Sequence, residues 1–249
     1  MVIDTSSLKS WRLGSQNLGT QRSQRPEQVV ARLGGVQAQD YRGAKWSIGL
    51  RTDGCTDKIV EQAIQDHSIV RTWMFRGTLH FVHADDLAWL TALLAPGIIK
   101  RNARRYGQLE LDAKAFISSQ QVIQQVLSAH AALTRAEIKT HFKQAGVPAE
   151  GQQVPYLLQR AALDGLICHG PHAGNEPTYV LLSNWVDLRQ TYDQVEALEL
   201  LTRRYFSSHG PATHKDFAWW AGLSAKDVRL ALESASGVEQ IDVDGVQYW

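Results

Sequence analysis

Two stretches carry most of the information in this chain, RTWMFRGTLH at residues 71–80 and GVQAQD at residues 35–40. The first lies within two β-rich runs, residues 69–75 and 78–83, that meet at Arg76 and Gly77. Short β-rich runs joined at a glycine predict a β-hairpin. The sequence therefore places a small hairpin after residue 68.

Short helices are predicted before this hairpin. Pro26 opens one that ends at Leu33, because proline is favoured in the first helical turn. A second covers residues 44–50, and Thr56 caps a third that ends near Asp66. Three helices followed by a hairpin are typical of a winged helix.

The same order recurs twice. Helices are predicted over residues 118–129, 134–145 and 153–164, with a hairpin at 166–182, and then from 193, over 213–221 and 224–234, with a hairpin at 238–249. Thr134 and Glu137 form a capping-box pattern. These patterns predict a mainly α protein with small β-hairpin wings, class α+β, made of three tandem winged-helix modules around one concave face with no continuous sheet. The modules are 1–110, 111–190 and 191–249, with junctions near 107–115 and 188–194.

Charge is distributed unevenly along a chain of 249 residues whose net charge is only +1. Residues 1–110 hold 15 lysines and arginines against 10 acidic residues (+5), whereas residues 111–249 hold 11 against 15 (−4). A polyanion would therefore be held by the first module and by residues 100–105, KRNARR. Alternatively, residues 100–105 are the solvated end of a helix that begins near Asp85.

The two cysteines, Cys55 and Cys168, fall in different modules. They form neither a disulfide framework nor a zinc cluster, which favours a reducing compartment. Residues 1–10 lack the pattern of a signal peptide, and no apolar run approaches membrane length. The expectation is a cytoplasmic, nucleoid-associated protein.

Two further motifs lie near the C-terminus, HGPAT at 209–213 and DFAWWAGL at 216–223. With the two earlier motifs they extend over nearly the whole chain. In this order, with GVQAQD and RTWMFRGTLH, they resemble the tandem winged-helix DNA glycosylases of the AlkZ and YcaQ type. That resemblance implies a monofunctional DNA repair hydrolase that excises alkylated, N7-alkylguanine-type or crosslinked purines from double-stranded DNA, without metal or cofactor and as a monomer. Such proteins usually continue into a C-terminal β-barrel, so residues 191–249 are expected to be a third module truncated before it.

The resemblance implies that Gln37 and Gln39 are catalytic, because Gln37-Ala38-Gln39 matches the family's glutamine-aliphatic-glutamine motif. Side chains two residues apart share a face only in extended or irregular backbone. Gly34 and Gly35 weaken the preceding helix, so the two amides are expected to converge where it ends. Relatives of the YcaQ type have aspartate at the second position, and Asp40 stands beside Gln39 here.

Candidate DNA contacts come from three segments. Side chains alternate between the two faces of a strand, and this alternation places Arg71 on the same face as the core residues of the hairpin. Arg76, Thr78 and His80 are therefore the better candidates. His80 and His83 lie on opposite strand faces and do not suggest a metal site. The remaining candidates are Arg42, Lys45, Arg101, Arg104 and Arg105.

Other functions are compatible with the residues alone. Winged helices also form non-catalytic DNA-binding proteins such as transcription regulators, although those commonly bind as dimers and no dimerisation zipper is evident. A protein-interaction scaffold is the third possibility, supported by the weak net charge. The glutamine amides themselves are also compatible with surface or helix-capping roles.

Overall fold

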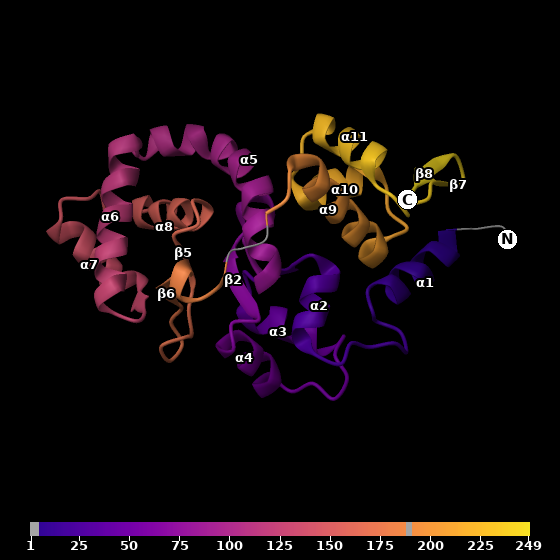
Figure 1. The fold of residues 1–249 in the computed structure, drawn as a ribbon, viewed down its shortest axis with the longest axis horizontal. Helices are drawn as coiled ribbons and strands as arrows, with labels where there is room; N and C mark the ends of the chain where they lie inside the picture. The colour runs from indigo at the N-terminus through magenta and orange to yellow at the C-terminus, as the bar shows by residue number, and fades with distance from the viewer. Residues whose placement is uncertain (1–4, 188–190) are drawn as a thin grey trace.

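The computed structural model describes residues 5–187 and 191–249 (Figure 1). The first part contains these elements: α1 (Thr5–Ser15), α2 (Pro26–Leu33), β1 (Val36–Gln37), α3 (Tyr41–Gly49), α4 (Asp57–Gln65), β2 (Ile69–Trp73), the 3-10 turn η1 (Phe75–Gly77), β3 (Leu79–His83), a second 3-10 turn η2 (Ala84–Asp86) and α5 (Leu87–Gln108). The predicted hairpin is confirmed. Helix α3 begins earlier than predicted, because the Asp40 side chain caps it.

The rest of the chain follows the predicted order of elements. It contains α6 (Ala113–Ala129), β4 (Leu133–Thr134), α7 (Arg135–Gln144), α8 (Gln153–Leu163), β5 (Ile167–His169), β6 (Thr178–Leu181), the 3-10 turn η3 (Leu182–Asn184), α9 (Gln194–His209), α10 (His214–Ala221), α11 (Ala225–Ser234), β7 (Ile241–Val243) and β8 (Val246–Tyr248). Thr134 and Asp193 each cap a helix in a capping box, and Ser224 caps α11. The break between α5 and α6 lies at residues 109–112, and the second predicted junction begins in residues outside the described ones.

Each of the three repeats has a short segment between two of its helices that bonds to the end of its hairpin. In the first repeat this segment is β1, between α2 and α3, which pairs with β3, and in the second it is β4, between α6 and α7, which pairs with β6. In the third repeat, Ala212, between α9 and α10, exchanges both backbone hydrogen bonds with Trp249, which follows β8, at 3.0 and 2.9 Å.

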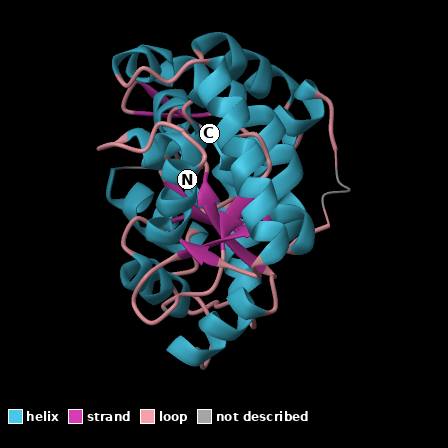
Figure 2. Ribbon diagram, turned by 90° about the vertical axis from the view of Figure 1, so that its left-hand side faces the viewer, coloured by secondary structure: helices cyan, strands magenta, loops and turns pink. Residues whose placement is uncertain are grey.

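The first two hairpins join into one sheet of six strands, in the order β1-β3-β2-β5-β6-β4. The prediction of no continuous sheet is therefore wrong. The junction is an antiparallel contact at Arg71 and His169, which brings two edge strands together and so covers backbone groups that would otherwise be open to solvent. Figure 2 shows the strands with helices to either side.

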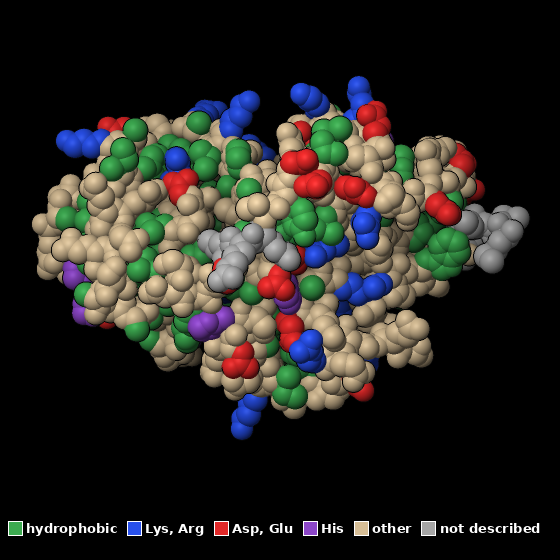
Figure 3. All heavy atoms as spheres, in the orientation of Figure 1, with side chains coloured by type: hydrophobic (Ala, Val, Ile, Leu, Met, Phe, Trp, Pro, Cys, Tyr) green, Lys and Arg blue, Asp and Glu red, His purple; other side chains and the backbone are tan. Residues whose placement is uncertain are grey.

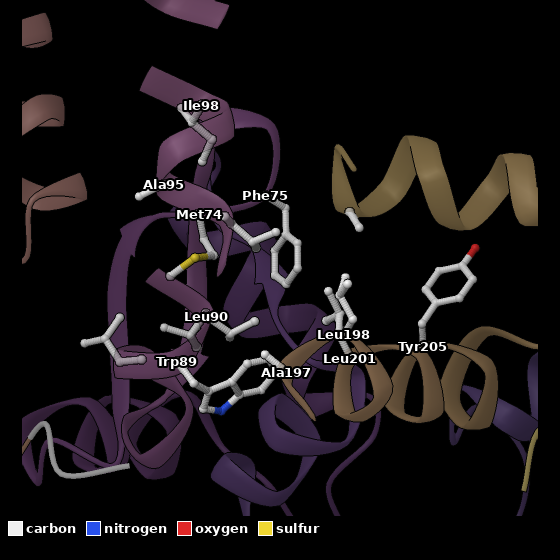
Figure 4. Close-up of a cluster of buried hydrophobic side chains, with 14 of the residues drawn as sticks. Met74, Phe75, Trp89, Leu90, Ala95, Ile98, Ala197, Leu198, Leu201 and Tyr205 are labelled. Atoms are coloured by element: carbon white, nitrogen blue, oxygen red, sulfur yellow. The ribbon is translucent and has the colours of Figure 1, made fainter. Parts of the chain in front are cut away.

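Buried side chains form three clusters. One lies among α2, α3 and α4 beneath Ile69 and Phe81, and a second among α6, α7 and α8. The third joins the first hairpin and α5 to α9, α10 and α11 (Figure 4). There Phe75, Trp89 and Leu198 are at most 1% exposed. Because this cluster is shared, the last three helices are held against the first hairpin.

Two polar contacts reinforce that junction. The carboxylate of Asp86, at the start of α5, is ion-paired with Arg204 of α9 and accepts a hydrogen bond from the Trp89 indole at 3.0 Å. Asp86 is 3% exposed. Across the described ranges, no helix combines the length and the apolar character needed to cross a membrane.

Candidate active site

The segment that carries the two glutamines is extended, as predicted. Gly34 ends α2 in the left-handed conformation, with φ of 74°. From Val36 to Gln39 buried and exposed residues alternate, so Val36 and Ala38 enter the core while Gln37 and Gln39 face solvent. Both amides therefore lie on the same side of an edge strand, which is the geometry that the motif requires.

The two amides differ in how they are held. Oε1 of Gln39 accepts a hydrogen bond from the backbone N–H of Leu79 at 3.1 Å. Across the described residues, no hydrogen-bond partner is found for the Gln37 side chain, whose backbone pairs with His80 in the sheet. Gln39 is thus positioned by the first hairpin, and Gln37 presents a free amide beside it.

Arg71 fixes the backbone between the glutamines. Its guanidinium donates two hydrogen bonds to the carbonyl oxygen of Ala38, at 3.1 Å from Nε and 2.8 Å from Nη2. The residue is 7% exposed, and burial lowers its pKa. The Tyr41 ring lies 5.3 Å from the guanidinium carbon. The alternation of residues along the strand correctly placed Arg71 on the core side. Its contact with Ala38, 33 residues away, could not be predicted from neighbouring residues.

Asp40 has a structural role. Its Oδ1 accepts hydrogen bonds from the backbone N–H groups of Arg42 and Gly43, both at 3.1 Å, at the start of α3. This is a helix N-cap, which stabilises the helix by satisfying two free donors. The structure therefore gives the carboxylate beside Gln39 a helix-capping role at the start of α3.

Lys45 and Arg42 occupy opposite environments on α3. Lys45 is 8% exposed and its ammonium lies 2.8 Å from Asp57 and 2.5 Å from Glu61. Burial alone would lower its pKa, but these two carboxylates outweigh burial and raise it. The Lys45 charge is thus neutralised inside the protein, and we do not retain it as a DNA contact. Arg42 is exposed, as a phosphate contact requires.

Strand parity predicted that Thr78 and His80 face solvent, but His80 is buried and Thr78 is half-buried. His80 is 3% exposed, its Nδ1 lies 3.0 Å from the carbonyl of Thr78, and its ring packs edge-on against Phe75. Burial lowers the pKa of His80 to about 4, so the imidazole is neutral at physiological pH. The Thr78 hydroxyl donates to the carbonyl of Phe75 at 3.2 Å. Both faces of β3 are covered, so parity alone does not identify its exposed residues.

The burial of His80 predicts a loss of stability in acid. In the unfolded chain its pKa returns to about 6.5, so between this value and about 4 the unfolded state binds more protons than the folded state. The free energy of unfolding should therefore fall as the pH is lowered through this range, by roughly 2 kcal/mol at pH 5 from this residue. Urea denaturation at pH 7 and pH 5 should show a weaker pH dependence for His80→Asn than for wild type. Equal pH dependence in both proteins would contradict the prediction.

Arg76 and Arg101 meet at the carboxyl end of α10. Arg76 donates to the carbonyls of Trp219 and Trp220 at 3.2 and 2.6 Å, and Arg101 donates to that of Gly222 at 2.9 Å. A helix ends with free carbonyls and partial negative charge, which arginine side chains stabilise. These two candidates therefore connect the first hairpin and α5 to the third repeat.

Other basic side chains remain at the surface of α5 and α11, over which Figure 3 shows Lys and Arg side chains along the upper edge. Arg105 bonds to Gln108 and Gln152, whereas Arg104 is exposed and has no bonded partner in the described ranges. A hollow of about 710 Å³ lies between α5, α9 and α11, and its lining contains Lys100, Arg101 and Lys226 together with Asp193 and Asp227. The basic side chains on its α5 side are the ones that could contact a polyanion.

Salt dependence should identify which arginines contact DNA. Because no partner of Arg104 is found among the described residues, Arg104→Ala should reduce the slope of log affinity against log salt by about 0.9, the contribution of one phosphate contact. Arg135→Ala, on α7, serves as a control with an exposed arginine and should leave the slope unchanged. Binding isotherms over a range of salt concentrations provide the measurement. An unchanged slope for Arg104→Ala would show that Arg104 is a solvated side chain of α5 and not a phosphate contact.

Comparisons with known proteins identify the family of this chain. The model of the family described as DNA glycosylase AlkZ-like matches residues 30–249. The chain belongs to that family. An interstrand DNA cross-link repair glycosylase from Streptomyces sahachiroi is 27% identical over 229 residues, covering 87% of this chain and 60% of the relative.

A solved structure from the same organism, the DNA glycosylase AlkZ, shares the fold of this AlkZ-like chain. The match covers 100% of this chain and 70% of that structure, with a TM-score of 0.79 and 23% sequence identity. The mixed helical fold with a small antiparallel sheet is therefore that of AlkZ. The chain spans about 60% of the length of the curated relative.

Proposed function

We propose that this protein hydrolyses the N-glycosidic bond of alkylated purines of the N7-alkylguanine type, or of crosslinked purines, in double-stranded DNA. The observation that carries the proposal is the pair of exposed amides, Gln37 and Gln39, on one side of β1. The hydrogen bond from Leu79 to Gln39 and the two from Arg71 to Ala38 fix this segment. Preorganised dipoles of this kind stabilise charge that develops in a transition state.

The chemistry needs little catalytic force, because an N7-alkylguanine is cationic and already a good leaving group. The bond between C1′ and N9 breaks and its electron pair passes to the purine, which leaves as a neutral base. A water oxygen then bonds to C1′ and releases one proton to solvent. Gln37, whose amide is free, positions this water, while the carbonyl of Gln39 faces the cationic sugar.

An open site suits a crosslinked base, which is tied to both strands and cannot rotate freely into a deep pocket. Gln37 and Gln39 lie on the exposed edge of the sheet, since β1 is its terminal strand. A duplex can approach such an edge without full extrusion of the damaged nucleotide. The name of the S. sahachiroi relative, which refers to cross-link repair, supports the same substrate class.

We further propose that the three repeats are winged-helix modules over residues 1–110, 111–190 and 191–249. The repeated order of elements, with a short segment bonded to the end of the hairpin in each repeat, supports this division. The duplex would be bound by a monomer through Arg42, Arg104 and the side chain of Lys100 on α5. A chromosomal DNA substrate implies that the protein works at the nucleoid.

Strand cleavage after base removal tests the proposal. A duplex that contains one N7-methylguanine should acquire an alkali-labile site when incubated with the protein, and borohydride should trap no covalent complex, because water rather than a lysine is the nucleophile. A strand that stays intact after alkaline treatment would contradict glycosylase activity. A borohydride-trapped complex would instead contradict the hydrolytic mechanism.

A further inference from the structure

Two adjacent tryptophans at the end of α10 have opposite environments. Trp220 packs against Phe75, with ring centroids 4.2 Å apart, and lies over Gly34, where a Cβ atom would be 3.2 Å from the indole. Trp219 is 70% exposed. The core does not require this exposed indole, so Trp219 is free to contact a partner.

Arg76 holds the exposed indole in place. Its guanidinium carbon lies 4.3 Å from the centroid of the Trp219 ring, and the same side chain donates to the Trp219 and Trp220 carbonyls. Arg76 adopts φ of 58°, a left-handed conformation that is unusual for a residue other than glycine. The cation covers one face of the indole, and the exposure of Trp219 leaves the other face open to solvent.

The indole belongs to the same neighbourhood as the glutamines. Helix α10 contacts the turn η1, which leads directly into the Leu79 N–H that bonds to Gln39. Trp220 in turn packs over Gly34, three residues before Gln37. Arg101 approaches the same helix end from α5. The surroundings of Trp219 are thus basic and close to the segment that carries the amides.

We propose that Trp219, supported by Arg76, stacks on a nucleobase that is unstacked next to the damaged purine. Every base has a flat face that an indole can cover, so this contact stabilises the opened duplex without reading sequence. The flanking arginines favour a polyanion over an apolar protein partner. This inference rests on the proposed function, and it assigns Trp219 a positioning role rather than a part in bond cleavage.

The experiment uses a duplex in which 2-aminopurine lies next to a stable tetrahydrofuran abasic analogue, because the fluorescence of 2-aminopurine reports base stacking. Wild-type protein should change this fluorescence on binding, and Trp219→Ala should lose that change and bind this duplex about 10-fold to 100-fold more weakly. Trp219→Phe keeps an aromatic face and should retain most of both. Trp46→Ala, which removes a tryptophan that is 71% exposed on α3, is the matched control and should behave as wild type.

The outcomes separate the two proposals. If wild-type protein cleaves alkylated DNA while Trp219→Ala shows an unchanged fluorescence signal and affinity, stacking is overturned and the glycosylase proposal stands. Loss of the signal in Trp46→Ala but not in Trp219→Ala overturns it equally. If wild-type protein neither binds the abasic duplex nor cleaves alkylated DNA, both proposals fail.

Discussion

Gln37→Ala should reduce the single-turnover release of N7-methylguanine by about 10²-fold to 10³-fold, or roughly 3 to 4 kcal/mol of transition-state stabilisation. The expected reason is the loss of a positioned dipole that acts on water and on the sugar cation. Folding should be unaffected, because the Gln37 side chain is exposed and no partner for it is found in the described residues. DNA affinity should also be nearly unchanged, since phosphates are bound by other side chains.

Gln39→Ala should lower the same rate to a similar extent, with a small additional cost in stability. Its Oε1 accepts the Leu79 N–H, which would have to find a water instead. Gln65→Ala, an exposed glutamine on α4, is a suitable control and should retain the wild-type rate. Wild-type rates in both Gln37→Ala and Gln39→Ala would remove these residues from the mechanism.

Gln39→Asp distinguishes a catalytic amide from a structural one. A carboxylate at this position resembles the arrangement in YcaQ-type relatives and is expected to retain activity above that of Gln39→Ala. A surface or capping role predicts instead that the alanine and aspartate variants have the same rate as wild type. Single-turnover kinetics on one N7-methylguanine duplex measures all three proteins.

Asp86→Ala should cause a large loss of stability, about 3 to 5 kcal/mol in the free energy of unfolding. The substitution removes the partner of Arg204 and leaves the buried Trp89 indole N–H without its acceptor. Asp86 is 3% exposed, so water does not readily replace the carboxylate. Since these contacts connect α5 to α9, the junction between the first hairpin and the third repeat should weaken most.

Asp86→Asn provides the control for this prediction. It keeps an oxygen acceptor for Trp89 and removes only the charge opposite Arg204, so its loss should be clearly smaller than that of Asp86→Ala. Urea denaturation of the three proteins at one pH gives the comparison. A loss below about 1 kcal/mol for Asp86→Ala would show that the ion pair adds little to stability.

Features that depend on neighbouring residues in the chain were predictable from the sequence. Thr56 and Thr134 cap helices as predicted, because an N-cap bonds to backbone groups two or three residues ahead. The exposure of Gln37 and Gln39 on one side of the segment also follows locally, since Gly34 ends the helix and extended backbone puts both side chains on one side.

Features that depend on distant contacts were not predictable. The pairing of Arg71 with His169 joins strands almost a hundred residues apart, and the sequence carries no sign that the two hairpins share an edge. Charge alone suggested phosphate binding for Lys45 and Arg76, but Lys45 is paired with Asp57 and Glu61, and Arg76 binds the end of α10. The sequence alone does not tell whether a basic side chain is buried or which residue it pairs with.

Release of free N7-methylguanine from methylated duplex DNA tests the central claim most directly. Wild-type protein should liberate the free base and leave an abasic site, whereas the double variant Gln37→Ala/Gln39→Ala should liberate it at least about 10²-fold more slowly while binding the same duplex. Chromatographic detection of the base under single-turnover conditions measures both. Tight DNA binding by wild-type protein with no release of the base would contradict the account and favour a non-catalytic DNA-binding protein.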